Sequence, residues 1–247
     1  MPHRLLDADD VVVDQQEAAE SALWQAEGDR SLFPVGVRAA VFDVVGTLVE
    51  PSPSVAAAYA TAAARQGVAA SVDELETLFA AAWKRQERID SQTVPAYETS
   101  RQRERQRWRT IVQEVFADRC DAATVSRIFD DLWEHFGLPS AWTPTRQGPR
   151  MVQAALDAGL EVVLASNFDE RLYDVATVLT PLSLASRVFP SSEIGWRKPA
   201  VEFFRAVEMR LGLEPAELVM FGDNPELDVA AAQAAGWHAV LLADAAG

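Results

Sequence analysis

Asp43, Ser166 and Asp223 each lie at or just beyond the end of a short apolar segment, in the sequences FDVVGTL, LASNFD and FGDNPELD. A carboxylate can act as a nucleophile or hold a hard cation through oxygen, and a hydroxyl can donate a hydrogen bond to an anion. One polar residue after a strand would carry little information, because strands commonly end in polar loops. Three such residues, each after its own apolar segment, indicate a shared site.

The apolar segments predict the strands that would position these residues. After Gly148 they alternate with helical patterns, and this order predicts a parallel sheet covered by helices on both faces. Ligands bind beyond the carboxyl ends of such strands, where the three residues would meet. The predicted fold class is α/β, a Rossmann-like, doubly wound parallel sheet. Strands are expected at 37–45, 160–165, 187–189, 218–221 and 238–242, with helices at 149–158, from about 169, at 199–211 and from 225.

Residues 51 to about 137 interrupt this pattern with four helical segments and no strand pattern. Ser71 and Glu74 have capping-box spacing, and Asp121 is a further N-cap candidate. Helices are expected at 54–65, 71–90, 99–118 and 121–137. We therefore predict three parts. The first is an extension at 1–36, with one helix at 11–26 and a linker at 31–36. The second is an α/β core at 37–50 and 143–247. The third is an inserted all-helical cap domain at 51–142.

Composition and charge limit the classes of partner. Of the 247 residues 49% are hydrophobic and 24% are charged, and the formal net charge is −15 at pH 7. Nucleic acid and membrane are therefore not expected as partners. The absence of a signal-peptide pattern and the single cysteine, Cys120, favour a cytoplasmic protein. An anionic ligand would need local cations, and Lys84 and Lys198 are the only lysines among 22 basic residues. The oligomeric state cannot be predicted.

Four motifs follow one another along residues 37–242. They are DVVGTL from Asp43 to Leu48, Ser166 after an apolar segment, Lys198 before Pro199, and GDNPELD from Gly222 to Asp228. In this order, and with a helical insert after the first, they resemble the motifs of the haloacid dehalogenase (HAD) superfamily. The phrases SNFDERL and EIGWRKP further resemble one subgroup, the haloacid dehalogenase-like hydrolase domain-containing protein 3 proteins.

The resemblance implies a Mg²⁺-dependent hydrolase that acts on a small phosphorylated metabolite through an aspartyl-phosphate intermediate. Asp43 would be the nucleophile, and Lys198 would neutralise charge between it and the phosphate. Mg²⁺ would screen the repulsion between these two anions. The implied metal ligands are Asp43, Asp223 and the backbone carbonyl of Val45, supported by Asn224 and Asp228, and the implied phosphate ligands are Thr47, Ser166, Asn167 and Lys198.

Val45 departs from the superfamily pattern. Most phosphatases of the superfamily have an aspartate there, two residues after the nucleophile, which protonates the leaving oxygen and later activates water. Valine cannot transfer a proton. General acid–base catalysis is typically worth about 10²–10⁴-fold in rate, or roughly 3–5 kcal/mol of barrier. We therefore expect binding and phosphoryl transfer to persist, and hydrolysis of the aspartyl-phosphate to be slow.

Val45 leaves four interpretations open. The first is a phosphomonoesterase for good leaving groups or with a substitute acid, for which Glu50 is a weak candidate. The second is a C–P bond hydrolase of the phosphonoacetaldehyde type, with Lys84 as the Schiff-base lysine. The third is a metal-free haloacid dehalogenase, which the complete GDN motif with Asp223 disfavours. The fourth is a binding module that keeps the fold without turnover.

The predicted cap would close over the site, exclude water and select the substrate, with hinges at 49–52 and 138–144. Its third helix carries five arginines. At helical spacing three of them share one face and two another. We favour the interpretation that these arginines form a solvated face and pair with Glu104 and neighbouring acids. The alternative is that one or two of them contact an anionic substrate. The arginines are Arg101, Arg103, Arg105, Arg107 and Arg109. The tryptophans of the cap, Trp83, Trp108 and Trp133, are expected to pack within it. Cys120 is expected to have a structural role.

Overall fold

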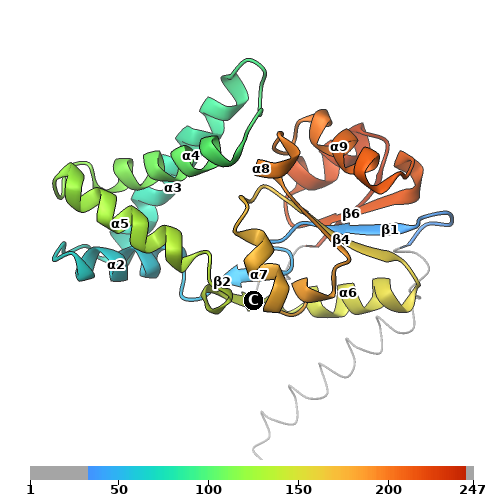
Figure 1. The fold of residues 1–247 in the computed structure, drawn as a ribbon, viewed down its shortest axis with the longest axis horizontal. Helices are drawn as coiled ribbons and strands as arrows, with labels where there is room; N and C mark the ends of the chain where they lie inside the picture. The colour runs from blue at the N-terminus through green and yellow to red at the C-terminus, as the bar shows by residue number, and fades with distance from the viewer. Residues whose placement is uncertain (1–32, 243–247) are drawn as a thin grey trace, which may run out of the picture. The chain divides into compact units, whose positions relative to one another are not determined.

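The computed structural model describes residues 33–242, so the expected helix at 11–26 lies outside the described residues. Five parallel strands form one sheet in the order β5-β4-β1-β6-β7 (Figure 1). Their bounds are β1 (Ala39–Phe42), β4 (Glu161–Ser166), β5 (Arg187–Pro190), β6 (Leu218–Gly222) and β7 (His238–Leu241). Phe42 pairs with Leu164 on one side and Phe221 on the other, so the ends of β1, β4 and β6 lie next to each other. The predicted α/β class is confirmed.

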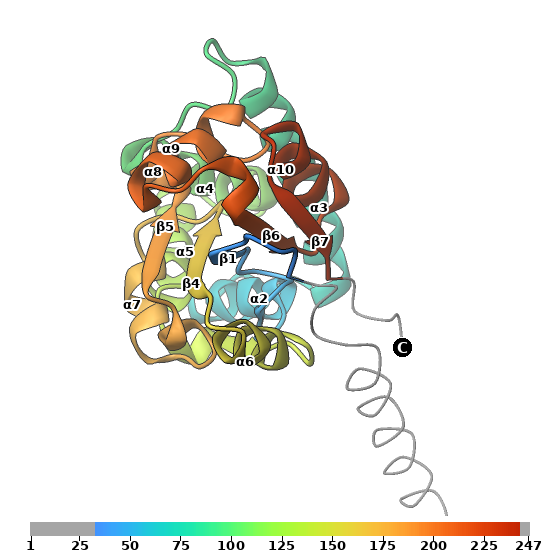
Figure 2. The same ribbon diagram turned by 90° about the vertical axis from the view of Figure 1, so that its right-hand side faces the viewer.

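Helices cover both faces of this sheet (Figures 1 and 2). One face carries α6 (Gly148–Asp157) and α7 (Leu172–Val178), and the other carries α8 (Ser191–Ile194), α9 (Val201–Leu211) and α10 (Ala231–Ala234). Phe203 and Phe204 of α9 are fully buried against Val41, Val163 and Met220 of the sheet. This apolar layer stabilises the scaffold that carries the strand ends. Short helical turns lie at Leu182–Leu184, Pro215–Glu217 and Pro225–Ala230, the last a π-helix.

The cap consists of α2 (Val55–Arg65), α3 (Val72–Gln92), α4 (Arg101–Phe116) and α5 (Ala122–His135). The side chains of Ser71 and Asp121 cap α3 and α5 at their N-termini, as predicted. The cap has its own hydrophobic core, against which Trp83, Trp108 and Trp133 pack. Cys120 packs there as well, in agreement with a structural role.

A two-stranded antiparallel ribbon joins the cap to the core, and the sequence patterns did not predict it. It pairs β2 (Val49–Pro51) with β3 (Trp142–Pro144), which follows a short 3-10 helix at Pro139–Ala141. The predicted domain borders, after residues 50 and 142, fall inside this ribbon. Both predicted hinges overlap it, and their role as hinges stays a prediction.

Among the element boundaries that differ from the predictions, two have an identifiable cause. The first strand ends at Phe42 instead of Val45, because the backbone turns there: the N–H groups of Leu48 and Val49 both donate to the carbonyl of Val44. The helix expected from Pro199 begins at Val201, because Lys198 and Pro199 lie in a turn that the N–H of Ala200 closes by donating to the carbonyl of Arg197 at 3.0 Å. Within residues 33–242, none of the helices has the length and hydropathy that a membrane span requires.

Candidate active site

The ammonium of Lys198 lies between two carboxylates at the carboxyl end of the sheet. Its Nζ donates to Asp43 Oδ1 at 2.6 Å and to Asp228 Oδ1 at 2.5 Å. All three side chains are buried or nearly so. Burial lowers the pKa of Lys198, but its ion pairs with Asp43 and Asp228 outweigh that effect, so the net pKa is raised. Lys198 is therefore a protonated cation held against the predicted nucleophile.

The three carboxylates of the site carry more negative charge than the ammonium of Lys198 compensates. Oxygen atoms of Asp43, Asp223 and Asp228 lie within 4.8 Å of one another. Burial, the largest cause, raises the pKa of Asp43 to about 7 even though Lys198 opposes this rise. The carboxylate thus needs more positive charge than the protein supplies if it is to be ionised at neutral pH. An all-oxygen donor set with two uncompensated negative charges fits a divalent hard cation such as Mg²⁺.

The loop after β1 fixes the position of Asp223. Thr47 Oγ1 donates to Asp223 Oδ1 at 2.9 Å. In return, the backbone N–H of Asp223 donates to Thr47 Oγ1 at 3.0 Å. Thr47 is buried and does not line the cavity, so its hydroxyl positions a carboxylate instead of binding phosphate as predicted. Gly46, at φ +86°, leaves no room for a side chain, because a Cβ there would lie 2.5 Å from Asp223 Oδ2.

Gly46→Ala is therefore expected to displace Asp223 and weaken cation binding. A cation present at 100 times its Kd stabilises a one-site protein by about 2.7 kcal/mol. This corresponds to a gain of roughly 5–11 °C in melting temperature, and Gly46→Ala should lose most of it. Thermal melts with and without Mg²⁺ measure this gain. Gly159→Ala is the matched control, since Gly159 has φ +75° and nothing within 4 Å of its Cβ position. Equal gains in both variants would contradict this role of Gly46.

Asn167 holds the backbone of Lys198 from both sides. Its Oδ1 accepts from the N–H of Lys198 at 2.7 Å, and its Nδ2 donates to the carbonyl of Lys198 at 3.0 Å. Asn167 thus positions Lys198, and its contact with phosphate stays a prediction. Asp228 and Asn224 are joined in a similar way, because the N–H of Asn224 donates to Asp228 Oδ2 at 3.0 Å. Their predicted role in supporting a metal ion stays a prediction.

The carboxylates and Lys198 lie in the wall of a cavity of about 870 Å³ between the sheet and the cap. The predicted site residues among its lining are Asp43, Val45, Ser166, Asn167, Lys198, Asp223, Asn224 and Asp228. Val45 is 37% exposed. Glu50 and Lys84 are exposed and lie outside this lining. The structure thus gives Glu50 no place as a substitute acid and Lys84 no place as a Schiff-base lysine.

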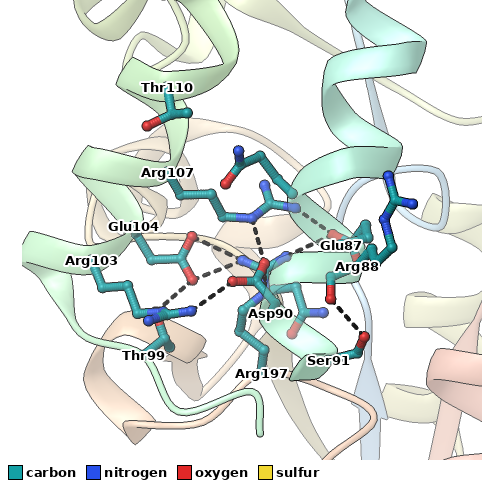
Figure 3. Close-up of polar contacts among 12 residues, drawn as sticks. Glu87, Arg88, Asp90, Ser91, Thr99, Arg103, Glu104, Arg107, Thr110 and Arg197 are labelled. Atoms are coloured by element: carbon teal, nitrogen blue, oxygen red, sulfur yellow. Dashed lines mark hydrogen bonds and ion pairs between the residues drawn. The ribbon is translucent and has the colours of Figure 1, made fainter. Parts of the chain in front are cut away.

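A buried ion cluster connects the cap to the residue before Lys198 (Figure 3). The guanidinium of Arg197 donates from Nη1 to both oxygens of Glu104 in α4, at 2.7 and 2.8 Å, and from Nη2 to Glu87 in α3 at 3.3 Å. Arg107 donates to Asp90 at 2.8 Å and also pairs with Glu87. All of these residues except Glu87 are at most 4% exposed.

The cluster corrects the prediction of a solvated arginine face on α4 at Arg107 and Glu104, whereas the other four arginines are exposed or half-buried and lie near acidic side chains as expected. Arg107 is buried, and Glu104 pairs with Arg197 of the core instead of with arginines of its own helix. Arg101 reaches Glu193 of the core, and Arg105 and Arg109 lie 3.8 and 4.0 Å from Asp130. None of the five arginines lines the cavity, so the alternative of contact with substrate receives no support from the geometry.

Backbone hydrogen bonds join the same two segments. The N–H of Thr99 donates to the carbonyl of Gly195 at 2.9 Å, and the N–H of Arg197 donates to the carbonyl of Tyr97 at 3.0 Å. Tyr97 adopts φ 62°, the left-handed region that non-glycine residues rarely occupy. We call these bonds, with the ion pairs of Arg197, the cap clasp.

Arg171 makes a second contact between core and cap. Its guanidinium forms two hydrogen bonds of 2.7 Å with Asp169, donates to the carbonyl of Trp133 at 2.7 Å and lies 3.6 Å from the centre of the Trp133 ring. Neither Arg171 nor Arg197 was predicted as a functional residue. The signal was present, since Arg171 belongs to SNFDERL and Arg197 to EIGWRKP. The two phrases that suggested a subgroup are those that contact the cap.

Comparison with known proteins agrees with this geometry. A sequence model of haloacid dehalogenase-like hydrolases matches residues 37–236. The haloacid dehalogenase-like hydrolase domain-containing protein 3 of Mus musculus is 31% identical over 210 residues, covering 84% of this chain and 82% of the relative. Among solved structures, a defluorinating L-2-haloacid dehalogenase aligns with a TM-score of 0.65 and 20% identity over 83% of this chain and 80% of its own. A HAD hydrolase of Bacillus subtilis bound to magnesium aligns with a TM-score of 0.58 and 19% identity over 83% and 88%.

The α/β core, the inserted helical cap and the aspartate–lysine–aspartate site define a hydrolase of the HAD type. The chain belongs to the haloacid dehalogenase-like hydrolase family, as its motifs predicted.

Proposed function

We propose that this chain is a Mg²⁺-dependent phosphomonoesterase that acts on a small phosphorylated metabolite. The observation that carries the proposal is the placement of Lys198 Nζ 2.6 Å from Asp43 Oδ1, with Asp223 and Asp228 beside them. A protonated lysine against a carboxylate nucleophile can attract and orient a phosphate dianion. The other oxygen ligands provide the place for the cation.

Each residue has a defined task in this reaction. Asp43 attacks phosphorus and forms the aspartyl-phosphate, while Lys198 neutralises charge on the phosphoryl oxygens. Ser166, at the end of β4, donates a hydrogen bond to the phosphoryl group. Mg²⁺, held by Asp43, Asp223 and the carbonyl of Val45, would neutralise charge on the nucleophile and the phosphate. Asn167 and Thr47 hold Lys198 and Asp223 in place.

Asp43→Asn is expected to lower phosphate release by at least about 10³-fold, because an amide neither attacks phosphorus nor compensates the ammonium of Lys198. Release of inorganic phosphate from an activated aryl phosphate with Mg²⁺ measures this loss, and removal of Mg²⁺ with a chelator should lower the wild-type rate as well. Asp118→Asn is the matched control, since Asp118 is exposed on the cap and outside the cavity. Equal rates in wild type and Asp43→Asn would exclude Asp43 as the nucleophile.

Val45 favours a second candidate, hydrolytic dehalogenation. A halide leaves without protonation, so a dehalogenase needs no acid at this position. In that reaction Asp43 would attack carbon, and no cation would be needed. Release of chloride from 2-chloropropionate, insensitive to chelation, would support this candidate. Against it stands Asp223, which the dehalogenase reaction does not require and which Gly46 and Thr47 hold in the site.

A further inference from the structure

Aromatic side chains make up a large part of the wall of the cavity beyond Asp43. Cap and core both contribute, and the rings contact one another: Trp83 lies 5.5 Å from Trp108, and Trp142 lies 5.5 Å from Phe168, centre to centre. Further rings of the wall are Tyr59, Phe79, Phe129 and Trp133. A volume of about 870 Å³ is in the range that holds a whole small organic molecule and far exceeds a phosphate group. The remainder of the substrate therefore meets an apolar, aromatic surface.

The cations of this wall are already paired. Among the residues lining the cavity, the basic ones are Arg171, Arg197 and Lys198. Arg171 is bonded to both oxygens of Asp169, Arg197 to both oxygens of Glu104, and Lys198 to the site carboxylates. The cavity thus offers Lys198 and the metal position to one phosphate. It provides no further cation for a second anionic group such as a carboxylate or another phosphate.

Val45 limits the leaving group. Without an acid at this position the departing oxygen leaves as an anion. Phenols have a pKa of about 10, as tyrosine does, whereas aliphatic alcohols lie closer to the value of about 15.7 for water. A phenolate leaves far more readily without protonation than an alkoxide does. The chemistry at Val45 and the aromatic wall therefore favour the same class of compound.

We propose that the substrates are phosphate monoesters of phenols or comparable aromatic hydroxyl compounds that carry no second anionic group. The proposal rests on the phosphomonoesterase function above. Asp43 forms a bond to phosphorus while the P–O bond to the ring breaks, and the electron pair leaves on a phenolate, which takes a proton from solvent. Water then attacks phosphorus, the bond to Asp43 breaks, and the proton of the water passes to the released phosphate. Phenol and inorganic phosphate are the products.

A panel of four phosphates tests the class with the wild-type enzyme and Mg²⁺. The compounds are phenyl phosphate, 1-naphthyl phosphate, 2-cyclohexylethyl phosphate and phosphoglycolate. We expect the two aryl esters to have a kcat/KM about 10²–10⁴-fold higher than that of the cyclohexylethyl ester. Between the aryl esters, kcat/KM should be about ten-fold higher for 1-naphthyl phosphate than for phenyl phosphate. Phosphoglycolate should be the poorest substrate. If the cyclohexylethyl ester or phosphoglycolate is turned over as well as the aryl esters or better, the aromatic class is overturned and the phosphomonoesterase function still stands. Turnover of no phosphate would overturn both.

A charge introduced at the cavity wall provides a second test. Ala80 lines the cavity and is exposed, so Ala80→Lys adds a cation without disturbing the core; Ala81→Lys is the control, since Ala81 is exposed and outside the lining. Ala80→Lys, but not Ala81→Lys, should lower KM for phosphoglycolate by about five- to ten-fold and leave KM for phenyl phosphate within about two-fold. If wild type already binds phosphoglycolate as tightly as Ala80→Lys does, a free cation exists and the proposal is wrong.

Discussion

Replacing Val45 with aspartate is expected to raise kcat/KM for an alkyl phosphate, which reports transfer of the phosphoryl group to Asp43, by about 10²–10⁴-fold, the usual worth of general acid catalysis. Val45 is 37% exposed and lines the cavity together with Asp43, so a carboxyl there would face the leaving oxygen. The gain should be smaller for an aryl phosphate, because a phenolate leaves without help. The measurement is kcat/KM for both ester types with Mg²⁺.

Val45→Asn separates proton transfer from polarity. Its amide has nearly the shape of aspartate but does not exchange a proton at neutral pH, so it should show no comparable gain. Heat stabilisation by Mg²⁺ should be retained in both variants, which establishes that the site is intact. A Val45→Asp enzyme with an intact site and no gain on the alkyl ester would show that proton transfer does not limit this reaction.

Arg197→Met is expected to lower the free energy of unfolding by about 3–5 kcal/mol, because it leaves the buried carboxylate of Glu104 without its partner. For a chain of this size the loss corresponds to roughly 6–20 °C in melting temperature. Arg197 and Glu104 are 2% and 1% exposed, so neither solvent nor salt can compensate for the missing charge. Thermal and chemical denaturation measure the effect.

Arg38→Met is the matched control, since the pair of Arg38 with Glu217 lies at the surface and its arginine side chain is 64% exposed. Such a pair is worth about 0–1 kcal/mol. The double variant Arg197→Met with Glu104→Leu should recover part of the lost stability, because both charges are then absent. If Arg197→Met is no more destabilising than Arg38→Met, the ion pairs of the cluster do not hold the cap to the core.

The fold and the centre of the site could be predicted because their signals are local. Asp43 and Asp223 each follow a short apolar strand, and parallel strands bring their carboxyl ends together whatever lies between them. Lys198 was predicted from its motif, and the structure places its ammonium on Asp43. The helical cap was visible as a long stretch without strand pattern.

The cap clasp could not be predicted because its partners are remote in sequence. Glu104 and Arg197 are separated by 93 positions, and nothing in the pattern of α4 distinguishes the acid that turns toward the core from the arginines around it. Helical periodicity assigns residues to faces but does not show what each face meets. The same limit applies to Thr47, whose hydroxyl bonds to Asp223 across 176 positions.

If the cap opens as predicted, the cap clasp would couple access to the cavity with the position of the residue next to Lys198. The ribbon of β2 and β3 and the clasp bind the cap to the core at separate places, and the clasp ends at the residue next to Lys198. A cap that moves away from the core would therefore break the hydrogen bond to the backbone N–H of Arg197. The adjacent Lys198 would then be held by residues of the core alone. The open form that admits bulk water would then also be the form in which the backbone next to Lys198 has lost its contacts with the cap. Such coupling would slow the reaction of a phosphorylated Asp43 with bulk solvent. The intermediate would meet bulk water only while the contacts between the cap and the residue next to Lys198 are broken.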